Sequence, residues 1–135
     1  MADDRFRIVI DTNILVSALV FGGQPGEVLK LAINGRVKAV TSTPLLLELA
    51  GVLTNKFRYS EQRNRAIETK LRQISVVVVP SQKVTILGTA DDRVLETALA
   101  GRCSYIVTGD RELLELGNFE GVKIINLHEF IAIFS

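Results

Sequence analysis

Short runs of apolar, β-branched residues alternate along the chain with stretches in which apolar residues recur every three or four positions. The runs predict buried strands, and the periodic stretches predict amphipathic helices. Strands are expected at 7–11, 38–41, 76–79, 105–108 and 123–126, and helices at 12–20, 27–34, from 44 to at least 53, 60–72, 91–101, 111–116 and 127–134. Glycine and proline predict a loop at 21–26. Strands interleaved with helices predict an α/β fold with a parallel sheet.

The predicted strands are apolar throughout instead of alternating with polar residues, and the run at 76–79 is the most β-branched of them. This pattern predicts a sheet buried on both faces, with residues 1–135 forming a single domain. In such sheets ligands bind in the crevice beyond the carboxyl ends of the strands. Side chains that follow the strands are therefore the candidates for chemistry.

Acidic residues occupy several of these places. Asp11 follows the first strand, Asp110 follows the fourth, and Asp91 and Asp92 begin the helix that leads into the fourth. Glu48 lies inside a leucine-rich helix, where a bare buried carboxylate is costly. Carboxylates that converge on one edge repel one another unless a cation lies among them, and hard oxygen ligands suit Mg²⁺ or Mn²⁺. The residues alone thus indicate a metal-dependent phosphodiesterase or phosphatase.

Each of these acids also has a structural interpretation. Asp11, Asp91 and Asp110 stand where an aspartate caps the following helix, and Glu48 could lie on the exposed face of its helix. A phosphatase with an aspartyl nucleophile is less favoured, because Asn13 stands where the second aspartate would be expected.

Composition narrows the class of protein. The chain is 47% hydrophobic and 23% charged with a net charge of +1, which excludes disorder. Cys103 and His128 are single, which excludes a disulfide scaffold and a zinc site built from cysteine and histidine. No apolar run reaches about 18 residues, and residues 1–7 do not resemble a secretory signal. A cytoplasmic protein with no membrane segment is therefore expected.

Positive charge is concentrated between residues 56 and 72, beside Phe57 and Tyr59. Cations next to aromatic rings suit a single-stranded nucleic acid, for which the candidate contacts are Arg58, Arg63, Arg65 and Arg72. The alternative is a solvated helix on which Glu61 and Glu68 pair with arginines four residues later. The apolar C-terminal segment 130–134 is expected in the core, with a dimer or antitoxin surface as its alternative.

Three segments and the acid between them resemble the motifs of the PIN-domain family. They are IVIDTN at 8–13, DDRVL at 91–95 and YIVTGD at 105–110, with Glu48 in order between the first two. The resemblance spans nearly the whole chain and is greatest to small single-domain toxins similar to the VapC ribonucleases. One departure is Gly88-Thr89, where similar proteins often have Asp-Pro. The resemblance implies a three-layer α/β/α sandwich with a five-stranded parallel sheet in the order 3-2-1-4-5.

It further implies a metal-dependent endoribonuclease that cuts single strands and acts as the toxin of a toxin–antitoxin pair. Mg²⁺ or Mn²⁺ would be held by Asp11, Asp110 and either Asp91 or Asp92, with Asp91 favoured and Glu48 near the ion. Thr12, Asn13 and Thr108 would orient ligands or phosphate. The implied partners are single-stranded RNA, an antitoxin protein and a second copy of the chain. A PIN module that binds nucleic acid without catalysis, and a hydrolase of small phosphoesters, are the alternatives.

Overall fold

A computed structural model of the chain describes residues 5–135. Within these residues the elements are β1 (Arg7–Ile10), α1 (Thr12–Val20), α2 (Gly23–Ile33), β2 (Lys38–Ser42), α3 (Thr43–Phe57), α4 (Glu61–Ile74), β3 (Ser75–Val78), α5 (Thr89–Ala100), β4 (Tyr105–Val107), α6 (Arg111–Leu116), β5 (Asn118–Phe119), β6 (Val122–Ile125) and α7 (Leu127–Phe134). Strands and helices alternate for most of the chain, which confirms the α/β class. Apart from their exact ends, the expected elements are all present.

The sheet has six strands in the order β3-β2-β1-β4-β6-β5. All neighbours are parallel except β5 and β6, which form an antiparallel hairpin. The expected order 3-2-1-4-5 is confirmed with β6 as its fifth strand, but the expected count of five was wrong. The extra strand has two residues and lies between Gly117 and Gly121, whose φ angles of 71° and 89° provide the turns at both of its ends.

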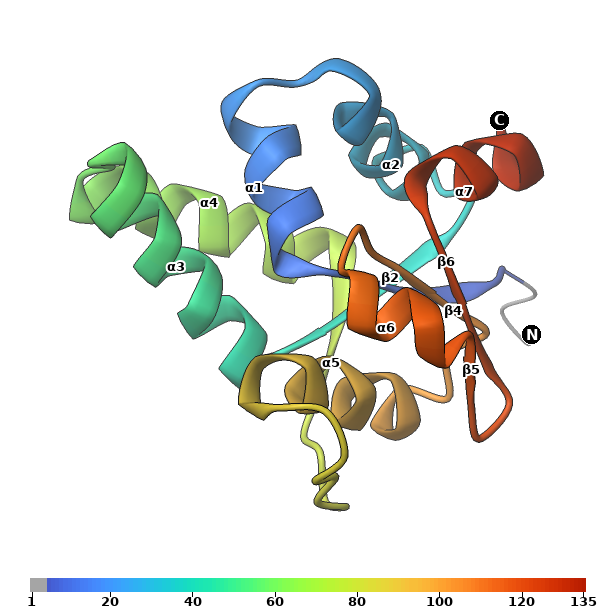
Figure 1. Cartoon of the computed structure of the whole chain (residues 1–135). Helices are drawn as coiled ribbons and strands as arrows, with labels where there is room; N and C mark the ends of the chain where they lie inside the picture. The colour runs from blue at the N-terminus through green and yellow to red at the C-terminus, as the bar shows by residue number, and fades with distance from the viewer. Residues whose placement is uncertain (1–4) are drawn as a thin grey trace.

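Both faces of the sheet are covered, as the apolar strands predict. In β1, Ile8 and Ile10 join one hydrophobic cluster and Val9 joins the other. Helices α1, α2 and α7 contribute to the cluster of Ile8, and α5 and α6 contribute to that of Val9. Figure 1 shows α1 and α2 above the sheet and α5 below it. The result is three layers with a helical layer on each side.

Two local expectations were wrong. Residues 23–26 belong to the first turn of α2 and not to a loop, because Pro25 is compatible with a first helical turn and Gly22, with φ of 73°, makes the preceding bend. The run at 76–79 is not fully buried: β3 is an edge strand whose residues are half-buried, and Val79 is 88% exposed.

Within residues 5–135, no single helix has the length and apolarity needed to cross a membrane. Only α1 and α2 taken together have this length and apolarity, and the two helices are bent by 102° at their junction. The expectation about a secretory signal depends partly on residues 1–4, which lie outside the described residues.

The close approach of α5 to the sheet gives a first prediction. A methyl group added at Gly101 would lie 2.5 Å from Cγ1 of Val40, a buried β-branched side chain that has little freedom to move. We expect Gly101→Ala to lower the free energy of unfolding by about 1–3 kcal/mol, measured by urea denaturation. Gly51→Ala is the matched control: it adds the same methyl group into open space within α3 and should raise stability by about 0.5–1 kcal/mol. Equal stability of the two variants would contradict the proposed steric clash.

Candidate active site

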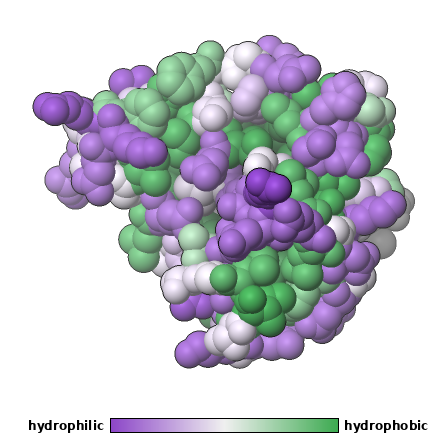
Figure 2. Space-filling model, viewed as in Figure 1, coloured by the Kyte–Doolittle hydropathy of each residue, from purple (hydrophilic) through white to green (hydrophobic). Residues whose placement is uncertain are grey.

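The candidate site lies at the carboxyl ends of the central strands β1 and β4. Figure 1 shows the N-terminal turns of α1, α3, α5 and α6 around this edge of the sheet. Each helix N-terminus carries partial positive charge, which favours anions in this region. In the space-filling view of Figure 2, hydrophilic side chains gather over α6 at the centre of this face, and a hydrophobic area lies below them, near the start of α5.

Asp11 is the most buried acid of the site, with 6% of its surface exposed. It occupies the N-cap position of α1, but its side chain accepts no capping hydrogen bond, so the capping interpretation was wrong for this residue. Instead Oδ2 accepts a 2.6 Å hydrogen bond from the Thr108 hydroxyl. Burial raises the pKa of Asp11, the bonds from Thr108 and the Thr12 backbone lower it, and the charge of Asp110 raises it.

Asp110 and Asp91 approach each other from different helices. Asp110 caps α6 as the structural interpretation predicts, since its Oδ1 accepts from the Leu113 amide at 3.1 Å, and its own amide donates to the Thr108 hydroxyl. Asp91 does not cap α5, whose N-cap is Gly88, but lies within the first turn. Burial raises the pKa of Asp91 to about 6, helped by the charge of Asp110, hydrogen bonding to Asp110, and the charges of Asp11 and Glu112.

Glu48 completes the group from α3. It is half-buried, whereas the neighbouring Leu47 is 68% exposed, so the interpretation of Glu48 as a residue of the exposed face was wrong. Burial raises its pKa, the nearby Thr12 hydroxyl lowers it, and the charge of Asp11 raises it. Thr12 is itself buried, and among the described residues its hydroxyl makes no well-formed hydrogen bond. A buried hydroxyl near Glu48 that makes no well-formed hydrogen bond is available as a ligand or donor at the site.

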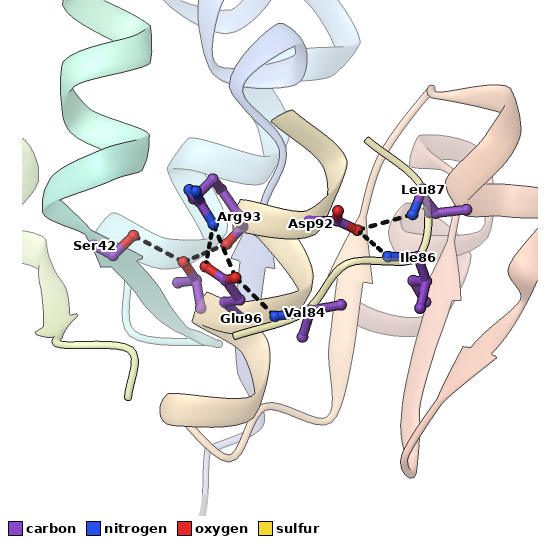
Figure 3. A network of polar contacts seen from close by, with 8 residues as sticks. Ser42, Val84, Ile86, Leu87, Asp92, Arg93 and Glu96 are labelled. Carbon is purple, nitrogen blue, oxygen red and sulfur yellow. Dashed lines mark hydrogen bonds and ion pairs between the residues drawn. The ribbon is translucent and has the colours of Figure 1, made fainter. Parts of the chain in front are cut away.

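Asp92 does not join this group. Its Oδ1 accepts hydrogen bonds from the amides of Ile86 at 3.2 Å and Leu87 at 3.0 Å, so it holds the segment before α5 in place, as Figure 3 shows. Of the two candidate ligands in the acidic pair, the structure therefore brings Asp91 to Asp11 and Asp110, and turns Asp92 to the backbone. Asn13, the other polar residue of the first motif, is exposed on α1.

Sequence reasoning missed Glu112. It lies in the first turn of α6 and adds negative charge near Asp91. The available signal was its position two residues after Asp110, at the start of a helix that follows a central strand.

The donor set fits a hard divalent cation. Asp11, Asp91 and Asp110 offer carboxylate oxygens, which are the ligands that Mg²⁺ and Mn²⁺ prefer. Burial and, after it, the neighbouring carboxylates raise the pKa of Asp91, and a positive ion would relieve the repulsion among these carboxylates. Within residues 5–135, no three acidic, histidine or cysteine side chains are arranged as a finished metal site. The three aspartates would therefore have to move closer together to share an ion.

The basic segment lies on the hairpin of α3 and α4, at the left of Figure 1. Glu61 pairs with Arg65, and Glu68 pairs with Arg72 at 2.9 Å, which are the two pairs of the solvated-helix interpretation. Arg63 stacks on Tyr59, with its guanidinium carbon 3.9 Å from the ring centroid. Arg58 ends α3 in the left-handed conformation, with φ of 57°.

Cys103 is buried and His128 is exposed, so neither residue joins the acidic cluster. At the C-terminus, Phe130 and Phe134 are core residues, whereas Ile133 is 50% exposed.

Comparison with known proteins identifies the class to which this fold and site belong. A family model of the PIN domain matches residues 7–112, so the chain belongs to the PIN-domain family. The match includes all the acids of the candidate site.

The chain is also 30% identical over 130 residues to MJ1680 of Methanocaldococcus jannaschii, covering 92% of this chain and 84% of that protein. Two solved structures share the fold. VapBC2 from Rickettsia felis, bound to a DNA fragment from its promoter, aligns with a TM-score of 0.63 and 20% identity over 89% of this chain and 98% of the other. The PIN domain endonuclease Utp24 aligns with a TM-score of 0.56 and 19% identity over 89% and 84%.

The raised pKa of Asp91 predicts a pH dependence of stability. Between pH 3.8 and about 6 the folded protein binds the Asp91 proton more tightly than the unfolded chain does, so in EDTA the unfolding temperature should fall as the pH rises through this window. Asp91→Asn should flatten this fall, and Glu120→Gln, at an exposed turn, should leave it unchanged. A wild-type curve with the same slope as that of Asp91→Asn would contradict the crowding of carboxylates.

Proposed function

We propose that this chain is a metal-dependent endoribonuclease that cuts single strands and acts as the toxin of a toxin–antitoxin pair. The observation that carries the proposal is the convergence of Asp11, Asp91 and Asp110 from three elements of a PIN domain, with the pKa of Asp91 raised to about 6. Carboxylates that crowd at this edge of the sheet, at a cost to stability, are expected where a cation and a phosphate bind.

In this proposal each residue has a distinct task. Asp11, Asp91 and Asp110 hold Mg²⁺ or Mn²⁺, and the Thr108 hydroxyl fixes the orientation of Asp11. When bound, such an ion stabilises charge on a phosphodiester and lowers the pKa of water. Glu48, half-buried beside Thr12, accepts a proton from water at the cluster.

Thr12 and Asn13 orient the substrate phosphate, and Thr108, whose hydroxyl proton is donated to Asp11, orients the ligand Asp11. Thr12 has a buried hydroxyl without a well-formed hydrogen bond among the described residues, and Asn13 is exposed at the same helix start. The name of Utp24 supports the nuclease activity, because it describes a PIN domain endonuclease of similar fold. The proposed protein partners are an antitoxin and a second copy of the chain, and the proposed location is the cytoplasm. The similar fold of VapBC2 supports the antitoxin alone.

Substitution of Asp11 is the direct test of catalysis. Asp11→Asn keeps an oxygen that accepts from Thr108 but removes the charge, so cleavage of a single-stranded RNA in Mn²⁺ should fall at least about a hundredfold. The unfolding temperature in EDTA should stay the same or rise, because clustered charge is relieved. Asp110→Asn should behave alike, and EDTA should stop wild-type cleavage.

Glu115→Gln is the matched control, since it neutralises a 68% exposed carboxylate further along α6 and should leave the rate unchanged. Full metal-dependent cleavage by Asp11→Asn would refute the assignment. RNA binding by the wild type without any cleavage would favour the non-catalytic PIN module instead. Hydrolysis of small phosphoesters without cleavage of RNA would favour the small-molecule hydrolase.

The basic segment of α4 supplies a second test, directed at RNA binding. Replacing Arg63, Arg65 and Arg72 together with glutamine should weaken binding about equally for all sequences. It should also flatten the log–log salt dependence by roughly 0.7 for each phosphate that is no longer neutralised. Binding is measured by fluorescence anisotropy in EDTA. Arg63 should contribute most to the loss of affinity, because Arg65 and Arg72 already have acidic partners. An unchanged salt slope would identify α4 as a solvated face.

A further inference from the structure

A second feature of the carboxyl edge lies beside the acids and has no role in the function proposed so far. It is a cavity of about 290 Å³ between the start of α3, the end of β3 and α5. Its lining residues are Thr43, Pro44, Val78, Val79, Pro80, Arg93 and Glu96. The cavity lies at the carboxyl ends of β2 and β3, which are next to β1 in the sheet, so it is on the same edge as the acidic cluster. Arg93 and Asp91 are two residues apart on α5, so their side chains leave the helix in directions about 200° apart.

The charged side chains of this cavity are held in a fixed arrangement, shown in Figure 3. Nη1 of Arg93 donates to both oxygens of Glu96, at 2.8 and 2.9 Å. Glu96 is 6% exposed and also accepts from the Val84 amide at 2.9 Å. The Arg93 carbonyl accepts from Thr97, which is bonded in turn to Ser42. Arg93 is therefore anchored at both its backbone and its guanidinium before any ligand arrives.

This anchoring leaves part of the guanidinium available. Only Nη1 is bonded to Glu96, and within residues 5–135 we find no hydrogen bond from Nε or Nη2. These two nitrogens form a fork that matches two oxygens of a phosphate. The side chain of Arg93 is 35% exposed, in contrast to that of Glu96, so the fork is within reach of a ligand from solvent.

The rest of the cavity suits the remainder of a nucleotide. Pro44, Val79 and Pro80 provide apolar walls, and Val79 is 88% exposed at the mouth. The Thr43 hydroxyl adds one polar group. A cavity of this size accepts a single unstacked nucleotide and not a base-paired one, which fits the single-stranded substrate of the proposed function.

We propose that the Arg93 cavity is a subsite for one nucleotide of single-stranded RNA, on the same edge of the sheet as the acidic cluster. The fork of Arg93 binds the phosphate of this nucleotide, and Pro44 and Val79 contact its sugar or base. The inference depends on the proposed ribonuclease function, and it names where the strand continues beyond the acidic cluster. Arg93 is a binding residue in this assignment and makes no contact with the reacting phosphorus.

The test compares binding and cleavage of one fluorescent single-stranded RNA. In EDTA, Arg93→Gln should raise the dissociation constant about tenfold and reduce the salt slope by roughly 0.7. Arg93→Lys should keep the wild-type salt slope but bind RNA more weakly, because an ammonium group keeps the charge and lacks the two parallel donors of the guanidinium. In Mn²⁺, Arg93→Gln should raise KM and leave kcat near the wild-type value.

Loss of the Arg93–Glu96 pair could also unfold the protein, so Val79 provides a second, independent variant. Val79 is nearly fully exposed, and its replacement has little effect on the core. Val79→Asp puts a negative charge at the mouth of the cavity and should weaken RNA binding more than the neutral Val79→Asn. Lys123→Gln is the matched control. It removes one exposed positive charge near the amino-terminal end of β6, away from the carboxyl ends of the strands, and should bind RNA as the wild type does.

The outcomes separate the two proposals. A wild type that cleaves RNA while Val79→Asp and folded Arg93→Gln bind it normally would overturn the subsite and keep the ribonuclease. The same applies if Lys123→Gln loses as much affinity as Arg93→Gln, because the effect would then reflect net charge alone. A wild type that neither binds nor cleaves RNA would refute the ribonuclease, and the subsite with it.

Discussion

The hydrogen bond from Thr108 to Asp11 is the interaction on which the candidate site depends. The two residues are 97 positions apart in the chain and meet because β1 and β4 are adjacent and parallel, with Ile10 opposite Val107. A carboxylate at the buried end of a central strand needs donors, and the usual capping hydrogen bond to the following helix is not formed. Since the Thr108 hydroxyl also accepts from the Asp110 amide, one side chain positions two acids.

The polar groups around α5 divide into two kinds. Asp92 and Glu96 are buried, and each has backbone amides or a cation as partner, so they stabilise the segment that precedes the helix. Asp91 instead has carboxylates as its nearest charged neighbours, and its pKa is raised to about 6. On this helix, the acids whose carboxylates are hydrogen-bonded or ion-paired have a structural role, and the acid that is repelled by other carboxylates belongs to the candidate site.

Periodicity and composition were enough to predict the α/β class, most strand and helix positions, and the edge of the sheet where acids gather. These features depend on local patterns of apolar residues, which this sequence displays clearly. The two-residue strand β5 and the early start of α2 were missed, because turns at glycines and a proline in a first helical turn decide them. The partners of Asp92 and the pairing of Glu96 with Val84 were also beyond prediction, since they arise only when the segment before α5 folds back on the helix.

The divergence of Asp91 and Asp92 has a consequence for how this part of the chain tolerates change. Successive residues of an α-helix point in directions about 100° apart, so one of the two carboxylates faces the cluster and the other faces the preceding segment. Insertion or deletion of one residue between Leu87 and Asp92 would change the length of backbone that lets the Ile86 and Leu87 amides reach Oδ1 of Asp92. One between Asp92 and the buried Val94 would turn both carboxylates about 100° relative to the buried face of α5. By contrast, residues 80–83 are bound to neither acid. Natural variation in length should therefore accumulate before Val84 and be absent between Ile86 and Asp92.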